Sequence, residues 1–433
     1  MLKIQTLKRK TGLIILSILI VSAMLVLSSC NSSNEKSKGD SKSIKVLLSE
    51  EPGEHDSFGK SLEKWEEKTG SKVEIIVIPY DDQLIKFPSM AKNKDLPDLI
   101  VTTRLHQKYP DEFIDLSKED DTSKFESTAL KVIGQADNSD KITGFPYQYT
   151  ITNMYYNKDV FDEAGLEAPT IDNPWSWDEV YKNAELLQKK GAVKYGLAVD
   201  FSRARYDTLM YANGGSIVEK KDESFIITVT GNETVSTLEK FAEMNNKAMP
   251  KAIWAGGTND NPADYFKNGN VGMYLSGSWN YNDFSTNIDS FKFAVMPTPK
   301  GSSSSSAIIG GTGLTVPKNA ENKELAIEFI KWMFEEENYQ YFLDNEKGLS
   351  ALNDVLYEPA NEEAEADFKV LLSEVDSVTE SFMTDKSSGW TGYLDNEYRN
   401  YLRKAISGEL TPKKALDEFA KDLSEKSGWK IKE

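Results

Sequence analysis

Short apolar runs alternate with amphipathic stretches from residue 45 onward, and this pattern predicts alternating strands and helices. The first expected elements are, in chain order, a strand at 45–48, a helix at 58–69, a strand at 73–78, a helix at 83–92 and a strand at 99–101. Gly70 follows the first helix directly and is typical of a helix end. A β-α-β-α-β order favours a parallel sheet with right-handed crossovers, so the chain is expected to have an α/β fold.

The mixed pattern continues to the C-terminus. Ser176-Trp177-Asp178-Glu179 matches a capping box and predicts a helix that runs to about Lys190. Thr411 followed by Pro412 predicts the start of the last helix. Further strands are expected at 154–157, 195–199 and 291–296, and further helices at 160–164, 233–248 and 324–334. No internal repeat of 20–50 residues is present.

The N-terminus has a different pattern, with four basic residues among the first ten and an apolar run at 13–27. This run is shorter than the roughly 20 residues of a spanning helix, so residues 1–29 are interpreted as a signal peptide. Leu27-Ser28-Ser29-Cys30 resembles a bacterial lipobox, and that resemblance implies cleavage before Cys30 and a lipid on its sulfur. The alternative is an N-terminal membrane anchor with an incidental cysteine.

Residues 31–43 are polar and rich in Ser and Lys, which predicts a flexible tether after the lipidated Cys30. Cys30 is the only cysteine of the chain, so the exported protein has no intramolecular disulfide. Its stability must therefore come from burial of a core, for which some 39% apolar residues are available. A length of 433 residues predicts at least two domains.

Charge and histidine content exclude several classes of function. A formal net charge of −18 disfavours binding to nucleic acid, and it would repel an anionic bilayer, so membrane contact is expected through the lipid. The chain has only two histidines, His55 and His106, which excludes a histidine-rich metal site. No motif predicts a cofactor, a metal site or a set of catalytic residues.

Several ordered segments together resemble the extracellular solute-binding proteins of ABC transporters, in the carbohydrate class of the maltose-binding type. The resemblance covers about 44–429. The segments that carry it are Leu96-Pro97-Asp98-Leu99-Ile100, Gly144-Phe145-Pro146-Tyr147, Tyr156-Asn157-Lys158-Asp159, Ala164-Gly165-Leu166, Ser176-Trp177-Asp178-Glu179, Gly272-Met273, Gly277-Ser278-Trp279, Gly310-Gly311-Thr312-Gly313-Leu314 and residues 326–332.

The resemblance implies a two-lobed periplasmic-binding-protein-like fold of type II, with ligand in the cleft between two α/β lobes. By analogy, the N-terminal lobe comprises 44–149 plus 295–343, and the C-terminal lobe comprises 150–294 plus 344–433. The chain would cross between lobes near Tyr149-Thr150 and Ala294-Val295, and closure around ligand would be a hinge motion there.

Aromatic residues are the first candidates for a sugar site, because flat rings stack on the apolar faces of sugars. Trp279 ends a glycine-rich segment that matches a cleft aromatic of the family. Trp390 lies between glycines, which favours an exposed ring. Trp254 is expected in a loop, and Tyr147 near the cleft floor; for each of the four, the alternative is a core position. Trp177 and Trp332 are interpreted as structural.

Polar candidates come from the loops after the predicted strands, because ligands bind at the carboxyl ends of strands in open sheets. Carboxylates and arginine can each bond two neighbouring hydroxyls. Gly310 and Gly311 can present bare backbone to a ligand, or form a tight turn. The strand-end candidates are Glu51, Tyr80, Asp82, Arg104 and Asp200, for which the alternative is a solvated loop position.

The leading hypothesis is a monomeric, lipid-anchored receptor on the extracellular face of a bacterial cell membrane. It would bind a sugar or oligosaccharide and deliver it to the permease subunits of an ABC importer. A second hypothesis keeps the scaffold but changes the solute to a polyamine, iron complex or peptide. An exported glycoside hydrolase would need two carboxylates about 5–10 Å apart, which no motif singles out. A surface adhesin is the fourth alternative.

Overall fold

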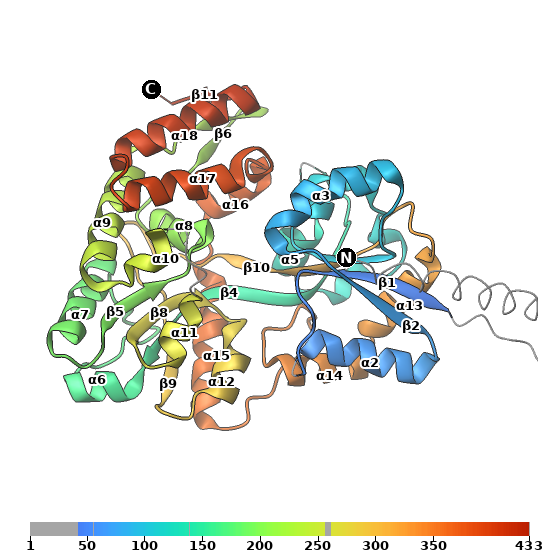
Figure 1. Ribbon diagram of the computed structural model, residues 1–433, viewed down its shortest axis with the longest axis horizontal. Helices are drawn as coiled ribbons and strands as arrows, with labels where there is room; N and C mark the ends of the chain where they lie inside the picture. The colour runs from blue at the N-terminus through green and yellow to red at the C-terminus, as the bar shows by residue number, and fades with distance from the viewer. Residues whose placement is uncertain (1–41, 55, 138, 256–260, 433) are drawn as a thin grey trace, which may run out of the picture. The chain divides into compact units, whose positions relative to one another are not determined.

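A mixed eight-stranded β-sheet organises the described part of the chain (Figure 1). The computed structural model describes residues 42–432 except 55, 138 and 256–260. Cys30, residues 31–41 of the predicted tether and His55 lie outside the described residues. Strands follow one another in the order β2-β1-β3-β10-β4-β8-β5, and β9 also pairs with β4. The predicted α/β class is confirmed.

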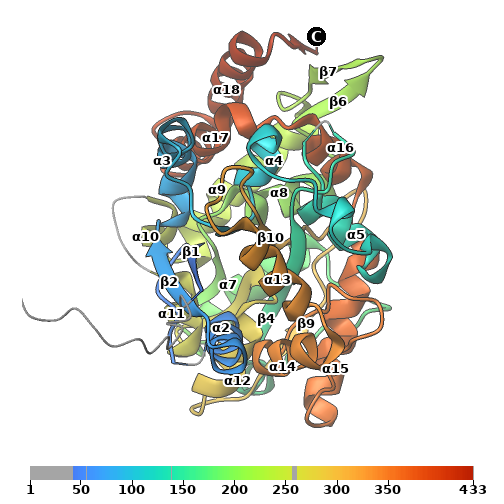
Figure 2. The same ribbon diagram turned by 90° about the vertical axis from the view of Figure 1, so that its right-hand side faces the viewer.

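Two sets of strands meet in this sheet, and a small second sheet lies apart from it. The strands of the large sheet are β1 (Ser43–Leu48), β2 (Lys72–Val77), β3 (Leu99–Thr102), β4 (Phe145–Asn157), β5 (Tyr195–Val199), β8 (Val271–Gly277), β9 (Phe293–Met296) and β10 (Ile309–Thr315). Figure 2 shows the small sheet beside the last helix. Its strands are β6 (Val218–Lys221), β7 (Ser224–Ile227) and β11 (Lys430–Ile431).

The first lobe, as we use the term, consists of β1, β2, β3 and β10 with the helices around them. These helices are α2 (Ser57–Thr69), α3 (Tyr80–Asn93), α4 (Leu105–Lys108), α5 (Ser127–Ala129), α13 (Lys323–Met333) and α14 (Glu336–Glu346). β1 pairs in parallel with both β2 and β3, as the β-α-β-α-β order predicts. α2 begins after Asp56, whose carboxylate accepts from the Gly59 N–H, and ends at Gly70 with φ 70°.

The second lobe consists of β5, β8 and β9 with the helices that pack on or beside them. These helices are α6 (Lys158–Ala164), α7 (Trp177–Lys189), α8 (Arg203–Ala212), α9 (Asn232–Ala248), α10 (Lys251–Ala255), α11 (Pro262–Lys267), α12 (Asn280–Asn287), α15 (Glu362–Glu374), α16 (Glu380–Ser388), α17 (Thr391–Ile406) and α18 (Pro412–Ser427). The predicted capping box is present at α7: the Glu179 N–H donates to Ser176 Oγ at 3.2 Å, and the Ser176 N–H donates to Glu179 Oε2 at 2.7 Å.

β4 belongs to both lobes. Its first part pairs antiparallel with β10, from Phe145 to Ile151. Its second part pairs with β8 from Thr152 onward, and on the other side with β9 from Met154 onward. The strand is buried along nearly its whole length, so its side chains join the cores of both lobes. Sequence analysis predicted only the last four residues of this strand.

The change of partner along β4 falls next to the predicted first crossing at Tyr149-Thr150. Ala294 and Val295, at the predicted return crossing, lie inside β9, where Val295 pairs with Tyr155. The predicted boundary at residue 295 therefore falls within a strand of the second lobe. Leu352 still bridges to Phe125 of the first lobe, beyond the predicted boundary at 344. As a division into moving parts, the lobes remain a prediction.

Gly311 provides a test of the junction between β4 and β10. Its φ is 145°, and a Cβ there would stand 2.1 Å from the Gln148 carbonyl oxygen. Gly311→Ala should therefore lower the free energy of unfolding by about 1–3 kcal/mol, measured by urea denaturation. At Gly310 a Cβ would meet only Thr150 Oγ1, at 3.2 Å, so Gly310→Ala should cost clearly less. Equal losses would contradict this account.

Candidate functional site

A cavity of about 630 Å³ lies where residues of both lobes face each other across the β4–β10 pair. This volume is in the range of small-molecule sites. Thr150 of β4 and Gly310 of β10 contribute to its lining from the shared strands. The first lobe contributes residues of α3, α4 and the loop between β3 and α4, and the second lobe contributes residues of α8, α16 and α17.

Six of the predicted ligand-binding residues line this cavity, and five do not. Those that line it are Trp279, Trp390, Gly310, Gly311, Tyr80 and Arg104. Those absent from the lining are Tyr147, Trp254, Asp200, Asp82 and Glu51. The search at strand ends therefore selected two residues that line this cavity, Tyr80 and Arg104, and three acidic residues that lie elsewhere.

Trp279 is an exposed aromatic side chain in the cavity. It directly precedes α12, two residues after the end of β8, and 40% of its surface is exposed. Its ring lies against the backbone of Gly277, where a Cβ would come within 1.9 Å of Cζ3. The Arg205 guanidinium lies over the ring, 4.9 Å from its centre. The absence of a side chain at Gly277 therefore allows this ring position.

Trp390 and Trp254 are core residues, contrary to expectation. Trp390 borders the cavity but is only 1% exposed, because its ring packs edge-on against Tyr398 and Phe419. Trp254 lies in α10 and not in a loop. It is fully buried, and its indole N–H donates to the Val199 carbonyl oxygen at 3.1 Å. Flanking glycines thus proved a poor sign of an exposed ring.

Two further predicted residues are held by neighbours that are distant in the sequence. Tyr147 is buried between Phe58 and Phe342 of the first lobe. Both oxygens of Asp200 accept hydrogen bonds from hydroxyls of β8, those of Tyr274 and Ser276.

The last two predicted residues lie near the ends of the first strands. Asp82 forms an ion pair with Lys86, one turn along α3, at 3.1 Å. Glu51 is an exposed residue in the segment after β1.

A charged network that sequence analysis missed spans the cavity. Asp395 of α17 accepts from Arg203 of α8 and from Arg104 of the first lobe, the latter at 3.3 Å. Burial favours the neutral form of Asp395, but the two arginines outweigh it and hold its pKa below the ordinary value. Arg203 also pairs with Asp207 at 2.9 Å. Arg203 and Arg205 follow the end of strand β5 by four and six residues, so a search that continued five residues beyond Asp200 would have included both.

Two lysines add further contacts between the lobes. Lys108 of α4 donates to the Gly392 carbonyl oxygen at 2.7 Å. Lys386 of α16 donates to Gln107 Oε1 at 2.5 Å and lies 3.7 Å from Asp137. Together with the Arg104–Asp395 pair, these contacts connect α4 and the segment after α5 with α16 and α17.

The first lobe also arranges its own side of the cavity. Arg104 lies over the Tyr80 ring, 3.7 Å from its centre, and donates to the Tyr80 carbonyl oxygen at 2.6 Å. Tyr80 is the first residue of α3 and is 43% exposed. His106 is not part of the site: it is buried beside Thr143, and burial lowers its pKa to about 3.

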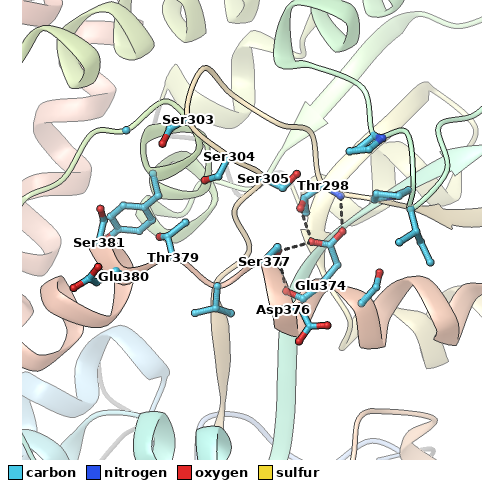
Figure 3. A pocket seen from close by; sticks show the side chains of 17 residues that line it. Thr298, Ser303, Ser304, Ser305, Glu374, Asp376, Ser377, Thr379, Glu380 and Ser381 are labelled. Carbon is cyan, nitrogen blue, oxygen red and sulfur yellow. Dashed lines mark hydrogen bonds between the residues drawn. The ribbon is translucent and has the colours of Figure 1, made fainter.

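A second cavity of about 620 Å³ lies within the second lobe and is shown in Figure 3. Eight of its 17 lining residues are serine or threonine, and its one aromatic residue among the described residues is Tyr211. Glu374 there already accepts from the Thr298 N–H and from the hydroxyls of Thr298 and Ser377. The first cavity is the candidate functional site, because it combines an exposed aromatic ring with charged groups from both lobes.

Comparison with known proteins identifies the family. The family model described as bacterial extracellular solute-binding protein matches residues 60–370. Curated relatives include a binding protein of Brucella abortus, 25% identical over 53% of this chain and 54% of that protein. The chain thus spans about half the length of the Brucella relatives. The arabinooligosaccharide-binding protein of Bacillus subtilis is 23% identical over 94% of this chain and 98% of that protein.

The fold comparison agrees with the sequence comparison. An ABC substrate-binding protein from Listeria monocytogenes, solved in complex with cycloalternan, superposes with a TM-score of 0.74 at 22% identity. That match covers 90% of this chain and 100% of the Listeria chain. The chain therefore belongs to the bacterial extracellular solute-binding proteins, as the resemblance of its motifs predicted. Within the described residues, no helix is both long and apolar enough to cross a bilayer.

Gly277→Ala tests whether the Trp279 ring position depends on a bare backbone. The added Cβ would overlap the ring, so the near-UV circular dichroism of the protein should change. In a Trp279→Ala background the same substitution should have little effect, because its clash partner is gone. Gly53→Ala is the matched control, since a Cβ there meets nothing within 4 Å. A spectral change of equal size in both backgrounds would contradict the assignment.

Proposed function

We propose that the mature protein is a lipid-anchored extracellular receptor that captures a sugar or oligosaccharide in the first cavity and delivers it to the permease of an ABC importer. The observation that carries this proposal is the exposed Trp279 ring in a cavity with hydrogen-bonding groups from both lobes. Sugars present apolar faces to such a ring and hydroxyls to such groups. The names of the Bacillus relative and of the Listeria complex also concern oligosaccharides.

Capture between the lobes would couple binding to closure. A ligand stacked on Trp279 of the second lobe could also contact Tyr80 and Arg104 of the first lobe, which line the same cavity. These ligand contacts would add to the ones that Lys108 and Lys386 already make between the lobes. Such contacts favour the closed arrangement, which a permease can then recognise. One chain supplies both faces of the cavity, and we therefore propose that the receptor acts as a monomer.

The carboxylates of the cavity favour binding over hydrolysis. A glycosidase needs a general acid whose pKa is raised. Asp395 has the opposite property, since two arginines hold its pKa below the ordinary value. Asp137 lies 3.7 Å from Lys386. Burial raises the pKa of Asp385 to about 7, but its oxygens already accept from the Ile217 and Val218 N–H groups and from the Tyr211 hydroxyl. We therefore propose no catalytic role for them. The cationic lining likewise disfavours a polyamine as the solute.

Trp279→Ala tests the proposed site. Removing the exposed ring should weaken sugar binding by at least about 2 kcal/mol, or roughly thirty-fold, as for a residue at the centre of an interface. Isothermal titration of the mature protein with the best member of an oligosaccharide panel measures the effect. Tyr341→Ala is the control, because Tyr341 is also exposed but lies outside the cavity lining. Unchanged affinity in Trp279→Ala, or heat only from a non-sugar solute, would contradict the proposal.

Cys30→Ala tests the anchor separately from the binding site. The precursor should lose incorporation of labelled fatty acid and move from the membrane fraction to the medium, because the lipid alone is proposed to hold it. Ligand affinity of the released protein should match that of the parent. Ser29→Thr tests the neighbouring position, and Ser43→Ala is a control beyond the proposed cleavage site. Retention of Cys30→Ala in the membrane would overturn the lipid anchor.

A further inference from the structure

The cavity has the opposite charge balance to the chain that contains it. The whole chain has 51 Lys and Arg against 69 Asp and Glu. The charged residues that line the cavity are Arg104, Lys108, Arg203, Arg205, Lys386 and Arg399, against Asp137, Asp385 and Asp395. An acidic protein thus surrounds a site in which cations outnumber carboxylates. Because the cations are concentrated in a partly buried cleft, a ligand bound there experiences a positive electrostatic potential.

The three carboxylates are already committed to protein groups. Asp395 is held by Arg203 and Arg104, and Asp137 lies 3.7 Å from Lys386. Asp385 accepts from two backbone N–H groups and the Tyr211 hydroxyl, and burial raises its pKa to about 7. Near neutral pH, Asp385 therefore supplies only part of a negative charge.

Of Arg104, Arg203 and Arg205, Arg205 makes the fewest hydrogen bonds to the described part of the protein, although the Arg104 Nε is also unpaired there. The Arg205 side chain is only 9% exposed, yet its Nε has no hydrogen-bond partner among the described residues. The nearest carboxylate oxygen, of Asp200, is 4.0 Å away and already accepts from the Ser276 hydroxyl. Thr152 accepts from the other side of the guanidinium. A buried guanidinium with an unpaired N–H is costly, and an anion that reaches it would relieve that cost.

Arg205 lies beside Trp279, so a positive charge and an exposed aromatic ring are close together in the cavity. The guanidinium carbon lies 4.9 Å from the centre of the indole. A sugar stacked on the exposed part of that ring would carry its ring substituents into the neighbourhood of the guanidinium. A planar carboxylate matches the fork of an arginine, whereas a neutral hydroxymethyl group accepts less strongly.

We propose that the ligand is an acidic oligosaccharide, in which the carboxylate of a uronic acid residue pairs with Arg205 while its ring stacks on Trp279. This inference rests on the proposed function, because it specifies the class of sugar for the same cavity. Arg104 and Lys108 contribute to the same positive field from the first lobe. A neutral sugar would offer the Arg205 N–H only a hydroxyl oxygen, which accepts less strongly than a carboxylate, and would gain nothing from the excess of cations.

The experiment compares acidic oligosaccharides with their carboxyl-reduced counterparts, which keep the same linkages but are neutral. Isothermal titration of the mature protein uses oligogalacturonides, glucuronoxylan fragments and unsaturated chondroitin fragments, each with its reduced partner. We expect one acidic member to bind at least tenfold more tightly than its reduced partner. We also expect its affinity to fall as salt is raised from 50 to 500 mM, while that of the reduced partner stays nearly constant.

Arg205→Gln separates recognition of charge from a structural role. It should weaken binding of the acidic sugar at least tenfold more than it weakens binding of the reduced partner. Arg205→Lys keeps the charge but not the fork, and should give an intermediate loss. Arg403→Gln removes an arginine of α17 outside the cavity lining and should leave both affinities unchanged. Equal losses for both sugars in Arg205→Gln would overturn the inference.

The remaining outcomes distinguish the inference from the proposed function. Preference for neutral sugars, or equal affinity for both members of each pair, would overturn the acidic class and leave sugar binding intact. Tight binding of sulfated but not carboxylated sugars would also contradict the proposal that the ligand contains a uronic acid. If the folded protein binds no sugar of either kind, the inference and the proposed function fall together.

Discussion

The site depends on one strand that two lobes share. β4 pairs with β10 through its first part and with β8 and β9 through its second, so neither lobe can complete its sheet without it. The cavity lies where these partners change, and its lining therefore includes residues of both lobes. A strand that is buried nearly throughout gives this junction a fixed geometry. Relative motion of the lobes would have to arise in the few backbone segments that cross beside it.

Electrostatics adds a second constraint to this geometry. Arginines reach the cavity from both lobes, and the Arg104–Asp395 pair connects them across it. In a partly buried site each cation needs a counter-charge or a full set of acceptors. Protein carboxylates supply the counter-charge for Arg203, whereas the nearest carboxylate to Arg205 is 4.0 Å away. The charge and the hydrogen-bonding deficit at Arg205 thus point to the ligand as the missing partner.

Local patterns in the sequence predicted most elements of the fold, because their causes are local. Capping groups such as Ser176 and helix ends such as Gly70 depend only on residues within one or two turns. β4 was predicted too short, since a strand buried on both faces lacks the alternation that identifies an exposed one. The acidic residue Asp200 was misjudged because its partners on β8 lie 74 and 76 positions away.

The candidate site could be predicted only in part for the same reason. Tyr80, Arg104 and Trp279 follow strand ends or a family motif, both of which are visible along the chain. Burial of Trp390 and Trp254 depends in part on packing against Phe419 and Phe201, which are 29 and 53 positions away along the chain. Asp395 meets Arg203 across 192 positions, and no spacing rule links them. The family comparison supports the scaffold, while the cavity residues specific to this chain required coordinates.

A crystal structure of the mature protein with its bound oligosaccharide would establish where the ligand lies. We expect the sugar in the first cavity, stacked on Trp279 and in contact with residues of both lobes. A sugar bound in the serine-rich cavity of the second lobe, or on one lobe without contact to Trp279, would contradict this expectation.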